Sequence, residues 1–473
     1  MKTIIITLVV SLISYSGLKA QKLWTLTECI EYSKNNNLAL KQQELGVKTG
    51  EASLRQSYAE ILPGINATAN HSYNYGRTVD RFTNQFASTR VQSDNFYLSG
   101  NFTVFNGFQQ VNSIKKGKTD LQAAKMDVDN YINELSQNIA LAYLNILYNI
   151  EMLDIANKQT AASKLQTERL KKLYDAGTKA KGDLLNMEAQ LAADELQQVN
   201  AANNLDMSYL TLKQLLDLPA EEQFDIVKPQ VEIDSGILIN LNPTEVFNYA
   251  LTNQPSVKSA ELKLKSSDLS LSIARGTISP TINLQGNIGT GYSGASQRIK
   301  GYETQQYVLG YTSEIPSIPV VSTYNNPLYE NIPFDDQVND NINKSIGLSL
   351  IIPLFNNLQS RTAISKAKIS VKNSEYVLQN EKNKLLKDIQ QAHLDAKAAL
   401  NKYNATNKNL SAFTEAFKYS EERFNAGLIN FVDYNDAKIR LEKAQAEMMQ
   451  AKYDCIFKIK LLEFYFGKPI GKL

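Results

Sequence analysis

The fold is decided by residues 109–177, which read QQVNSIKKGKTDLQAAKMDVDNYINELSQNIALAYLNILYNIEMLDIANKQTAASKLQTERLKKLYDAG. Up to Tyr174 this stretch contains no proline and only one glycine, Gly117, so it is expected to form a single helix about 100 Å long. Such a helix cannot bury its apolar side alone, because that side is the narrow seam of a coiled coil. The seam residues are Ile132, Leu135, Ile139, Ala142 and Ile146.

The same pattern occurs twice in the chain. Phe105-Asn106-Gly107 precedes Gly177 by 72 residues, and Phe355-Asn356-Asn357 precedes Gly427 by 72 residues. A constant offset of 250 residues therefore relates two copies of one structural repeat. The second copy predicts another long helix over residues 358–424. Its seam consists of Leu385, Ile389, Ala392, Ala396, Ala399 and Tyr403.

Each long helix ends at a glycine. The two breaks read Tyr174-Asp175-Ala176-Gly177 and Phe424-Asn425-Ala426-Gly427. Glycine suits the left-handed residue that closes a helix, so each rod is expected to fold back there as an antiparallel helical hairpin. The hairpin tips are thus predicted near residues 177 and 427.

The first 20 residues have the layout of a cleaved secretory signal peptide. Lys2 precedes an apolar stretch from Ile4 to Ile13, which is too short to cross a bilayer, and Ala20 ends the segment. Without Lys2 and Lys19 the chain has 48 basic and 48 acidic residues. This balance argues against nucleic acid as a partner, because phosphate binding needs a basic face.

The two cysteines, Cys29 and Cys455, lie far apart and have no spacing motif. A disulfide is chemically permitted in an exported chain, but two unpaired and partly buried thiols are the favoured alternative. The two histidines, His71 and His393, lack ligand spacing to cysteine or carboxylate. We therefore expect no catalytic site, no cofactor and no metal site.

Strand-like alternation follows Pro63 and Pro280. Apolar residues alternate with uncharged polar ones over about ten residues in four segments, which is the length of a tilted strand that crosses a bilayer. A half-buried sheet of a soluble sandwich has the same alternation. The polar face consists of Asn, Ser, Thr, Gln and Gly, which favours a wet lumen and hence the membrane. The apolar positions are Ile65, Ala67, Ala69, His71, Tyr73, Phe96, Leu98, Phe102, Val104, Ile282, Leu284, Ile288, Tyr292, Ile346, Leu348, Leu350 and Ile352.

Four strands cannot close a barrel, because small membrane barrels need about eight. An open edge in lipid would leave backbone groups without hydrogen bonds, so the barrel must be shared among subunits. The connecting segments, about 77–93 and 293–340, are polar and rich in tyrosine, and are interpreted as surface loops.

The chain is thus predicted to be mostly α with membrane β and to be internally duplicated. Residues 21–219 form the first repeat with a β-hairpin at about 65–105, and residues 242–473 form the second with a β-hairpin at about 281–353. Residues 220–241 are predicted to be a linker, in which Glu221 to Asp225 form a solvated connector.

These features together resemble the TolC-like outer-membrane efflux channel family. The resemblance covers nearly the whole chain after the signal peptide. It implies a homotrimer in the outer membrane, with twelve strands in one barrel and an α-barrel tunnel of long helices in the periplasm. It also implies a periplasmic adaptor and an inner-membrane pump or ABC transporter as partners. The motifs are Trp24-Thr25-Leu26, Pro63, Pro280, Val104-Phe105-Asn106-Gly107, Pro353-Leu354-Phe355-Asn356 and the glycine turns at Gly177 and Gly427.

The resemblance assigns roles to residues at the two tips. Asp433 and Asp436 match aspartates that ring the narrow end of the tunnel; a first-turn acid stabilised by the helix N-terminus is the alternative. Asp183 matches a position that holds the tip closed. Phe424 and Ile429 stand where the family has a tyrosine and an arginine, so the family's lock cannot be made here. The residues expected to contact the adaptor, or simply to cap the helices, are Ala176, Gly177, Thr178, Ala426, Gly427 and Leu428.

The family's channels export drugs, toxic small molecules, metal ions or secreted proteins and catalyse no reaction. The cargo of this chain does not follow from its residues. The alternative function is a soluble periplasmic coiled-coil scaffold or adaptor, which would share the signal peptide and the rods. Such a protein would not need ten-residue strands with unbroken apolar faces.

Overall fold

The structure is a computed structural model that describes residues 23–79, 84, 86–87, 90–219, 221–222, 224–229, 233 and 242–471. The chain divides into two units. The helical unit contains the described residues of 1–51, 119–266 and 371–473, and the strand unit contains those of 52–118 and 267–370. The predicted signal peptide, residues 1–20, lies outside the described residues, as does most of the predicted linker.

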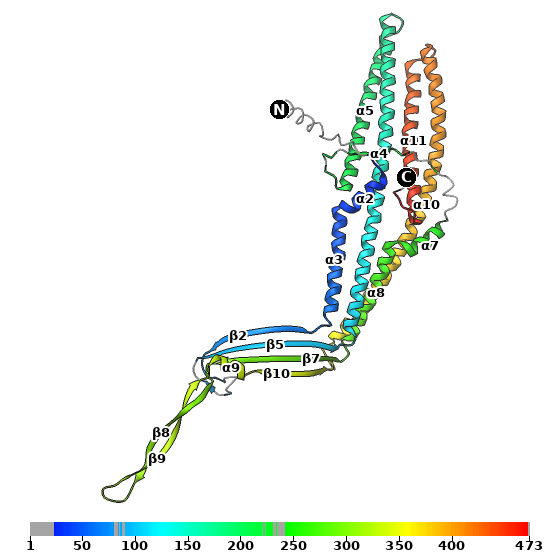
Figure 1. Cartoon of the computed structure of the whole chain (residues 1–473). Helices are drawn as coiled ribbons and strands as arrows, with labels where there is room; N and C mark the ends of the chain where they lie inside the picture. The colour runs from blue at the N-terminus through cyan, green and yellow to red at the C-terminus, as the bar shows by residue number, and fades with distance from the viewer. Residues whose placement is uncertain are drawn as a thin grey trace, which may run out of the picture. The chain divides into compact units, whose positions relative to one another are not determined.

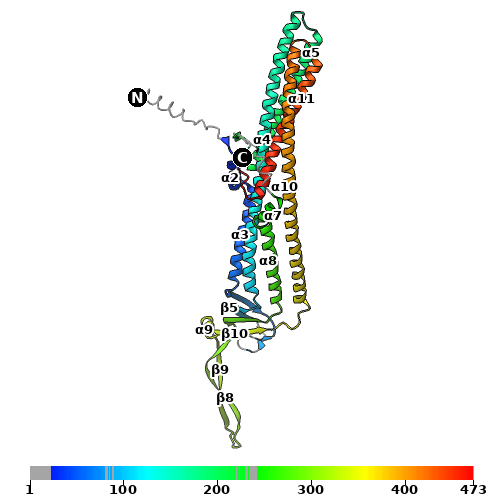
Figure 2. The same ribbon diagram turned by 90° about the vertical axis from the view of Figure 1, so that its right-hand side faces the viewer.

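Four long helices dominate the chain, and most of each belongs to the helical unit (Figures 1 and 2). α4 (Gln109–Asp175) and α5 (Lys181–Leu216) are joined at Gly177, and α10 (Gln359–Asn425) and α11 (Phe431–Tyr465) are joined at Gly427. The prediction of two uninterrupted rods is therefore confirmed.

Both rods end in the same hydrogen-bonded turn. The Gly177 N–H donates to the Tyr174 carbonyl at 2.8 Å, and the Thr178 N–H donates to the Leu173 carbonyl at 2.9 Å. Gly427 and Leu428 repeat these two bonds in the second hairpin. Gly177 and Gly427 have φ of +74° and +76°, a conformation that strains any residue with a side chain.

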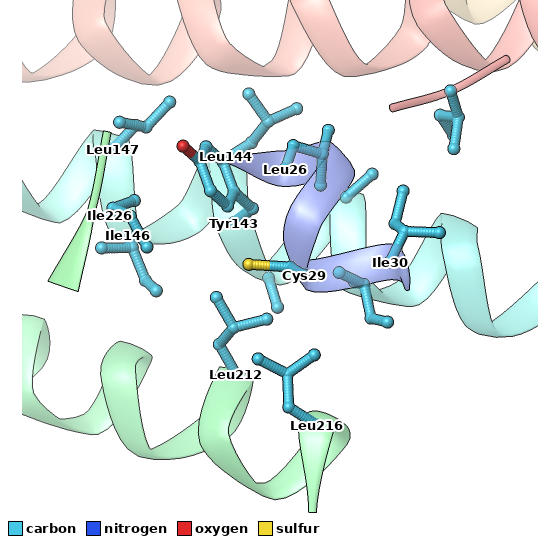
Figure 3. Close-up of a cluster of buried hydrophobic side chains, with 14 of the residues drawn as sticks. Leu26, Cys29, Ile30, Tyr143, Leu144, Ile146, Leu147, Leu212, Leu216 and Ile226 are labelled. Atoms are coloured by element: carbon cyan, nitrogen blue, oxygen red, sulfur yellow. The ribbon is translucent and has the colours of Figure 1, made fainter. Parts of the chain in front are cut away.

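The seam of α4 is packed in a core around Tyr143 (Figure 3). Ile139 and Ile146 are fully buried there together with Cys29 from the N-terminal segment and Leu212 from α5. The Tyr143 hydroxyl donates to the Val227 carbonyl at 2.6 Å, so the one polar atom of this ring has a partner. A coiled-coil seam thus becomes the core of a helical bundle.

The second rod has an equivalent core. Its predicted seam residues Leu385, Ile389, Ala392, Ala396 and Ala399 are all buried. They pack against residues of α11 and of a shorter helix, namely Cys455, Ile459, Leu462, Val246 and Ala250. Both cysteines are buried and unpaired, as the favoured alternative expected.

Among the described helices, α4 alone has a window long and apolar enough to cross a membrane by length and composition. Half of that window is buried within the protein itself. Its apolar residues Ile139, Tyr143 and Ile146 supply the core described above, so the hydropathy of this window is accounted for by packing between helices.

Shorter helices precede each group of strands. α2 (Leu26–Asn36) and α3 (Leu38–Ala59) occur in the first half, and α7 (Pro243–Asn253) and α8 (Pro255–Gly276) occur in the second. Thr25 caps α2 in a reciprocal pair of bonds with Glu28.

The prediction that residues 221–225 form a solvated connector is wrong in part. β1 (Leu23–Trp24) pairs in parallel with β6 (Asp225–Ile226), and Phe224 and Ile226 are buried in the Tyr143 core. The Asp225 carboxylate accepts a bond of 2.6 Å from the Tyr209 hydroxyl. A short acidic string was therefore mistaken for solvent-facing chain, because its burial depends on pairing with a strand about 200 residues away.

The strand unit contains one antiparallel sheet with the order β10-β7-β5-β2 (Figure 1). Its strands are β2 (Gly64–Asn74), β5 (Val91–Phe105), β7 (Thr281–Ser293) and β10 (Asn343–Ile351). β5 and β7 pair across the two halves of the chain. β2 and β10 are consequently the two edges of the sheet.

The register places the apolar residues on one face. Leu98 lies opposite Ile288, and Leu348 lies opposite Leu284. These side chains are exposed, Leu348 by 70%. Within the described part of this unit only a short helix at one end packs on this face, so the sandwich alternative lacks a covering layer.

The prediction that residues 293–340 form a surface loop is wrong, whereas the four predicted strands of the sheet are all present. This segment folds into β8 (Gln297–Tyr311), β9 (Pro319–Asn331) and α9 (Phe334–Asp340). Two register shifts, between Ile299 and Gly301 and between Val308 and Gly310, break the two-residue period. The alternation was therefore not visible in the sequence. Two more short strands pair in the other predicted loop, β3 (Thr78–Val79) and β4 (Phe86–Ala87).

The tip turns give a first test. Gly177→Ala should destabilise the chain by about 1–2 kcal/mol, because alanine is strained at positive φ. Gly182→Ala, five residues on, is the matched control: that glycine has ordinary helical backbone and open space around it. The control should be neutral or stabilising by about 0.5–1 kcal/mol. Thermal unfolding of the purified proteins measures both, and an equal loss in both variants would contradict the assignment.

Candidate functional site: the helical tips

The six tip residues named from the sequence are all exposed. Ala176, Gly177 and Thr178 form the turn of the α4–α5 hairpin, and Ala426, Gly427 and Leu428 form that of the α10–α11 hairpin. Leu428 is 70% exposed, although leucine is more often buried. The turns therefore offer backbone and one apolar side chain to a partner.

Behind the turns, an aromatic cluster joins the two hairpins. Phe424 of α10 stacks on Tyr434 of α11 with ring centroids 4.6 Å apart. Both rings are buried against Leu170 of α4 and against Leu184 and Met187 of α5. Burial, and secondarily Glu421, raises the pKa of Tyr434 to about 12, so its hydroxyl stays neutral. Phe424 is thus a packing residue here.

Two polar contacts reinforce this cluster near the turns. The Arg169 guanidinium of α4 donates to the Asn425 side-chain oxygen of α10 at 2.5 Å. The Lys179 ammonium lies 5.9 Å from the centre of the Phe424 ring. Both contacts connect the first hairpin to the end of the second rod.

A buried ionic cluster lies further from the turns. Lys438 of α11 donates to the Asp194 carboxylate of α5 and, at 2.6 Å, to the Ser163 hydroxyl of α4. The Ser163 hydroxyl also donates to Asp194, and the other carboxylate oxygen accepts a 2.8 Å bond from Gln190. Lys438 and Asp194 are each 5% exposed, so a full charge pair is held in the core.

Glu442 lies next to this cluster, and its carboxylate lacks a full set of hydrogen bonds. Its Oε1 is buried, has no hydrogen-bond partner and lies 3.5 Å from the Lys438 ammonium, which bonds instead to Asp194 and Ser163. Burial raises the pKa of this carboxyl. The cluster therefore has room for only one fully bonded anion.

The two predicted gate acids face away from this core. Asp433 is in the first turn of α11, where the Asn430 side chain caps its N–H at 2.9 Å. Asp436 forms an ion pair with Arg440 of its own helix at 2.9 Å. Both acids are exposed, whereas the neighbouring Tyr434 and Lys438 of the same helix are buried. The structure thus puts Asp433 and Asp436 on one free face of α11. Asp183 lies half-buried in the first turn of α5.

Sequence reasoning missed the ionic cluster, although a signal was present. Met187, Asp194, Ala201 and Ser208 recur every seven residues on α5, and all four are buried. Ser163 takes the same kind of position on α4, between Ala156 and Leu170. A charged residue inside a seven-residue repeat indicates a polar contact in the seam.

The described residues contain no group of three or more His, Cys, Asp and Glu side chains that could hold a metal ion. His71 lies beside Asp94 in the sheet, and His393 is a half-buried residue of α10. The chemistry of the site is therefore that of a contact surface and a charged face.

Comparison with known proteins agrees with this arrangement. Residues 29–217 and 320–458 match the model of the outer membrane efflux protein family. The chain belongs to this family. The predicted efflux function in the outer membrane, and the prediction that the chain is not an enzyme, are thereby confirmed.

Relatives of this efflux protein are distant but match along most of its length. Outer membrane protein TolC of Vibrio cholerae is 22% identical over 457 residues, which cover 95% of this chain and 93% of that protein. Alkaline protease secretion protein AprF of Pseudomonas aeruginosa is 20% identical over 415 residues, covering 86% and 77%. The crystal structure of the outer membrane protein VceC of Vibrio cholerae has a TM-score of 0.73 at 14% identity and covers 94% of this chain and 96% of VceC. The predicted fold class is confirmed.

The ionic cluster gives a second test. Lys438→Met leaves the buried Asp194 carboxylate without its cation, and removal of one partner of a buried pair costs about 3–5 kcal/mol. Unfolding of the detergent-solubilised protein should therefore begin at a clearly lower temperature. Lys443→Met, on the same helix in an exposed pair with Glu447, should change little. A small effect of Lys438→Met would show that the cluster is dispensable.

Proposed function

We propose that three copies of this efflux protein form the outer-membrane exit duct of a tripartite export system. Family membership and the likeness to VceC imply a trimeric export assembly. The observation that carries the proposal is the exposed apolar face of a four-stranded sheet whose two edge strands, β2 and β10, each pair on one side only among the described strands. Contact with lipid would cover the apolar face, and closure into a barrel would give the backbone groups of the two edges hydrogen-bond partners.

Three copies supply what one copy lacks. Each contributes four strands, so a trimer would provide twelve, which is within the range of closed membrane barrels. In such a barrel, β2 of one copy pairs with β10 of the next. The polar face, with Asn66, Asn101 and Asn283 among its residues, would then line a wet lumen.

The acids of α11 are proposed to form the constriction of the helical tunnel. Asp433 and Asp436 share a free face of α11, and threefold symmetry would bring six carboxylates around one axis. Such a ring attracts cations and repels anions. Arg440 pairs with Asp436 and offsets part of its charge, so Asp433 is expected to contribute the larger share of the field.

The exposed turns are proposed to contact the periplasmic adaptor. Ala176, Gly177 and Thr178 form one contact and Ala426, Gly427 and Leu428 form the other, while Asp183 helps to hold the closed tip. Within one copy, the aromatic cluster and the Arg169–Asn425 bond supply a connection between hairpins that does not need the family's tyrosine and arginine.

The cargo is proposed to be selected by the pump and the adaptor. AprF is named for secretion of an alkaline protease, and TolC and VceC for their place in the outer membrane. The alternative, a soluble periplasmic scaffold, is disfavoured by the exposed sheet face and by family membership.

The duct is tested by localisation and by channel formation. After cell fractionation, the mature chain should remain with the outer membrane through a salt wash, and only detergent should release it, as a trimer. The purified trimer should conduct ions in planar bilayers. Release of a monomer by salt alone, without detergent, would contradict the duct and favour the scaffold.

The gate assignment is tested by charge removal on one helix face. Asp433→Asn should weaken block of the conductance by a trivalent cation by about tenfold, and Asp436→Asn should weaken it less. Arg440→Gln should strengthen the block, because it frees the Asp436 charge. Asp454→Asn, an exposed acid further along α11, is the control and should have no effect. Equal block in all four variants and the native channel would refute the ring.

A further inference from the structure

The proposed duct gives no role to the two-stranded ribbon formed by β8 and β9. Its strands, Gln297–Tyr311 and Pro319–Asn331, pair only with each other among the described strands. The ribbon is inserted between β7 and β10 of the barrel sheet and extends beyond the end of β7 (Figure 1). An isolated two-stranded ribbon is marginally stable in water, so a contact along one of its faces is needed to hold it.

The two faces of the ribbon differ in charge. Because β9 has no bulge, residues paired with its odd-numbered positions lie on one face and those paired with its even-numbered positions lie on the other. The charged face carries Arg298, Glu303 and Glu330. The opposite face has no charged residue, and we call it the uncharged face. Its members are Gln297, Ile299, Tyr302, Thr304, Gln306, Val308, Tyr311, Pro319, Val321, Thr323, Asn325, Pro327, Tyr329 and Asn331.

The uncharged face is also the more apolar one. Six of its side chains are large and about half exposed or more, which is an extended apolar patch on a narrow ribbon. These are Ile299 at 48%, Tyr302 at 63%, Val308 at 49%, Tyr311 at 69%, Val321 at 48% and Tyr329 at 59%. This face is consequently the one that gains most from being covered.

The base of the ribbon is fixed by its charged face. Arg298 pairs with Glu330 across the strands at 2.9 Å and with Asp336 of α9 at 3.1 Å. α9 is in turn held on β7, because Gln337 exchanges two hydrogen bonds with the Ser293 backbone at 2.9 and 3.0 Å. The charged face is therefore turned toward the chain's own α9, and among the described residues the uncharged face has no such ion pair.

The position of the ribbon favours a second copy as its partner. The ribbon leads into β10, the edge strand that meets the next copy in the proposed barrel, so its base adjoins the interface between copies. Three ribbons on one barrel rim are held close together, which gives each a high effective concentration of the others. Packing identical charged faces together would take charged side chains out of water, whereas packing identical uncharged faces would not.

We propose that the uncharged faces of the three β8–β9 ribbons pack against one another and form a collar on the outer rim of the barrel. This inference rests on the proposed trimeric duct. The collar would be an interface between copies of this chain that the strand pairing of the barrel does not include.

Adjacent glutamines on opposite faces provide the test. Gln306 pairs with Thr323 on the uncharged face, and Gln305 pairs with Tyr324 on the charged face; both glutamines are exposed. Gln306→Cys and Gln305→Cys are each made in the full chain, and the purified trimers are treated with a short bismaleimide at high dilution. The native cysteines are buried, so the unmodified chain should give no cross-link.

The expected result is several-fold more cross-linked chain for Gln306→Cys than for Gln305→Cys, within trimers of unchanged mass. Adding Tyr302→Ser and Val321→Ser to the Gln306→Cys chain should reduce that yield, whereas adding Tyr307→Ser from the charged face should not. Equal yields, no yield at either position, or cross-links only between trimers would overturn the collar while the duct stands. Absence of a trimer by mass photometry would overturn the duct and the collar together.

Discussion

The backbone hydrogen bonds at the edges of a four-stranded sheet constrain everything else in this protein. In lipid, an N–H or C=O group without a partner costs several kcal/mol, and β2 and β10 each present a row of such groups. Among the described residues of the strand unit, only α9 packs on one end of the apolar face, and no further strand pairs with the two edges. The chain therefore depends on other copies of itself, and the trimeric assembly implied by its family is also a requirement of its sheet.

The helical unit must also cover apolar surface, and it does so by packing its helices against one another. A narrow seam of small and branched apolar residues builds two cores, one around Tyr143 and one around Ile389. Toward the turns the apolar seam gives way first to a buried ion pair and then to aromatic stacking. A buried ion pair adds little stability compared with apolar packing. Its two charges must meet, however, so the helices that carry them can pack in only one register. Three helices meet at Lys438, Asp194 and Ser163, so this cluster specifies their register.

Much of this architecture could be predicted from the sequence because it rests on local periodicity. The rods follow from the absence of proline and from the spacing of Leu135, Ile139 and Ala142, and the barrel strands follow from alternation. The features that the sequence did not predict depend on strands that pair over a long sequence separation, or on an alternation of side chains that bulges interrupt. Phe224 is buried only because Trp24 meets its segment, and the β8–β9 alternation is shifted by two bulges. The spacing of Asp433 and Asp436 predicts that they share a face of the helix. It does not predict the ion pair between Asp436 and Arg440, because that pair depends on side-chain conformation.

The two free thiols have a consequence for how this protein matures. Burial raises the pKa of Cys29 to about 12 and that of Cys455 to about 11, so almost no thiolate is present at neutral pH. Thiolate is the form that attacks disulfides and oxidants, and both sulfur atoms are also shielded from solvent. Once the chain is folded, these two thiols are protected in an oxidising compartment. They are open to oxidation only before the two cores close, and the folded chain holds no bond between them.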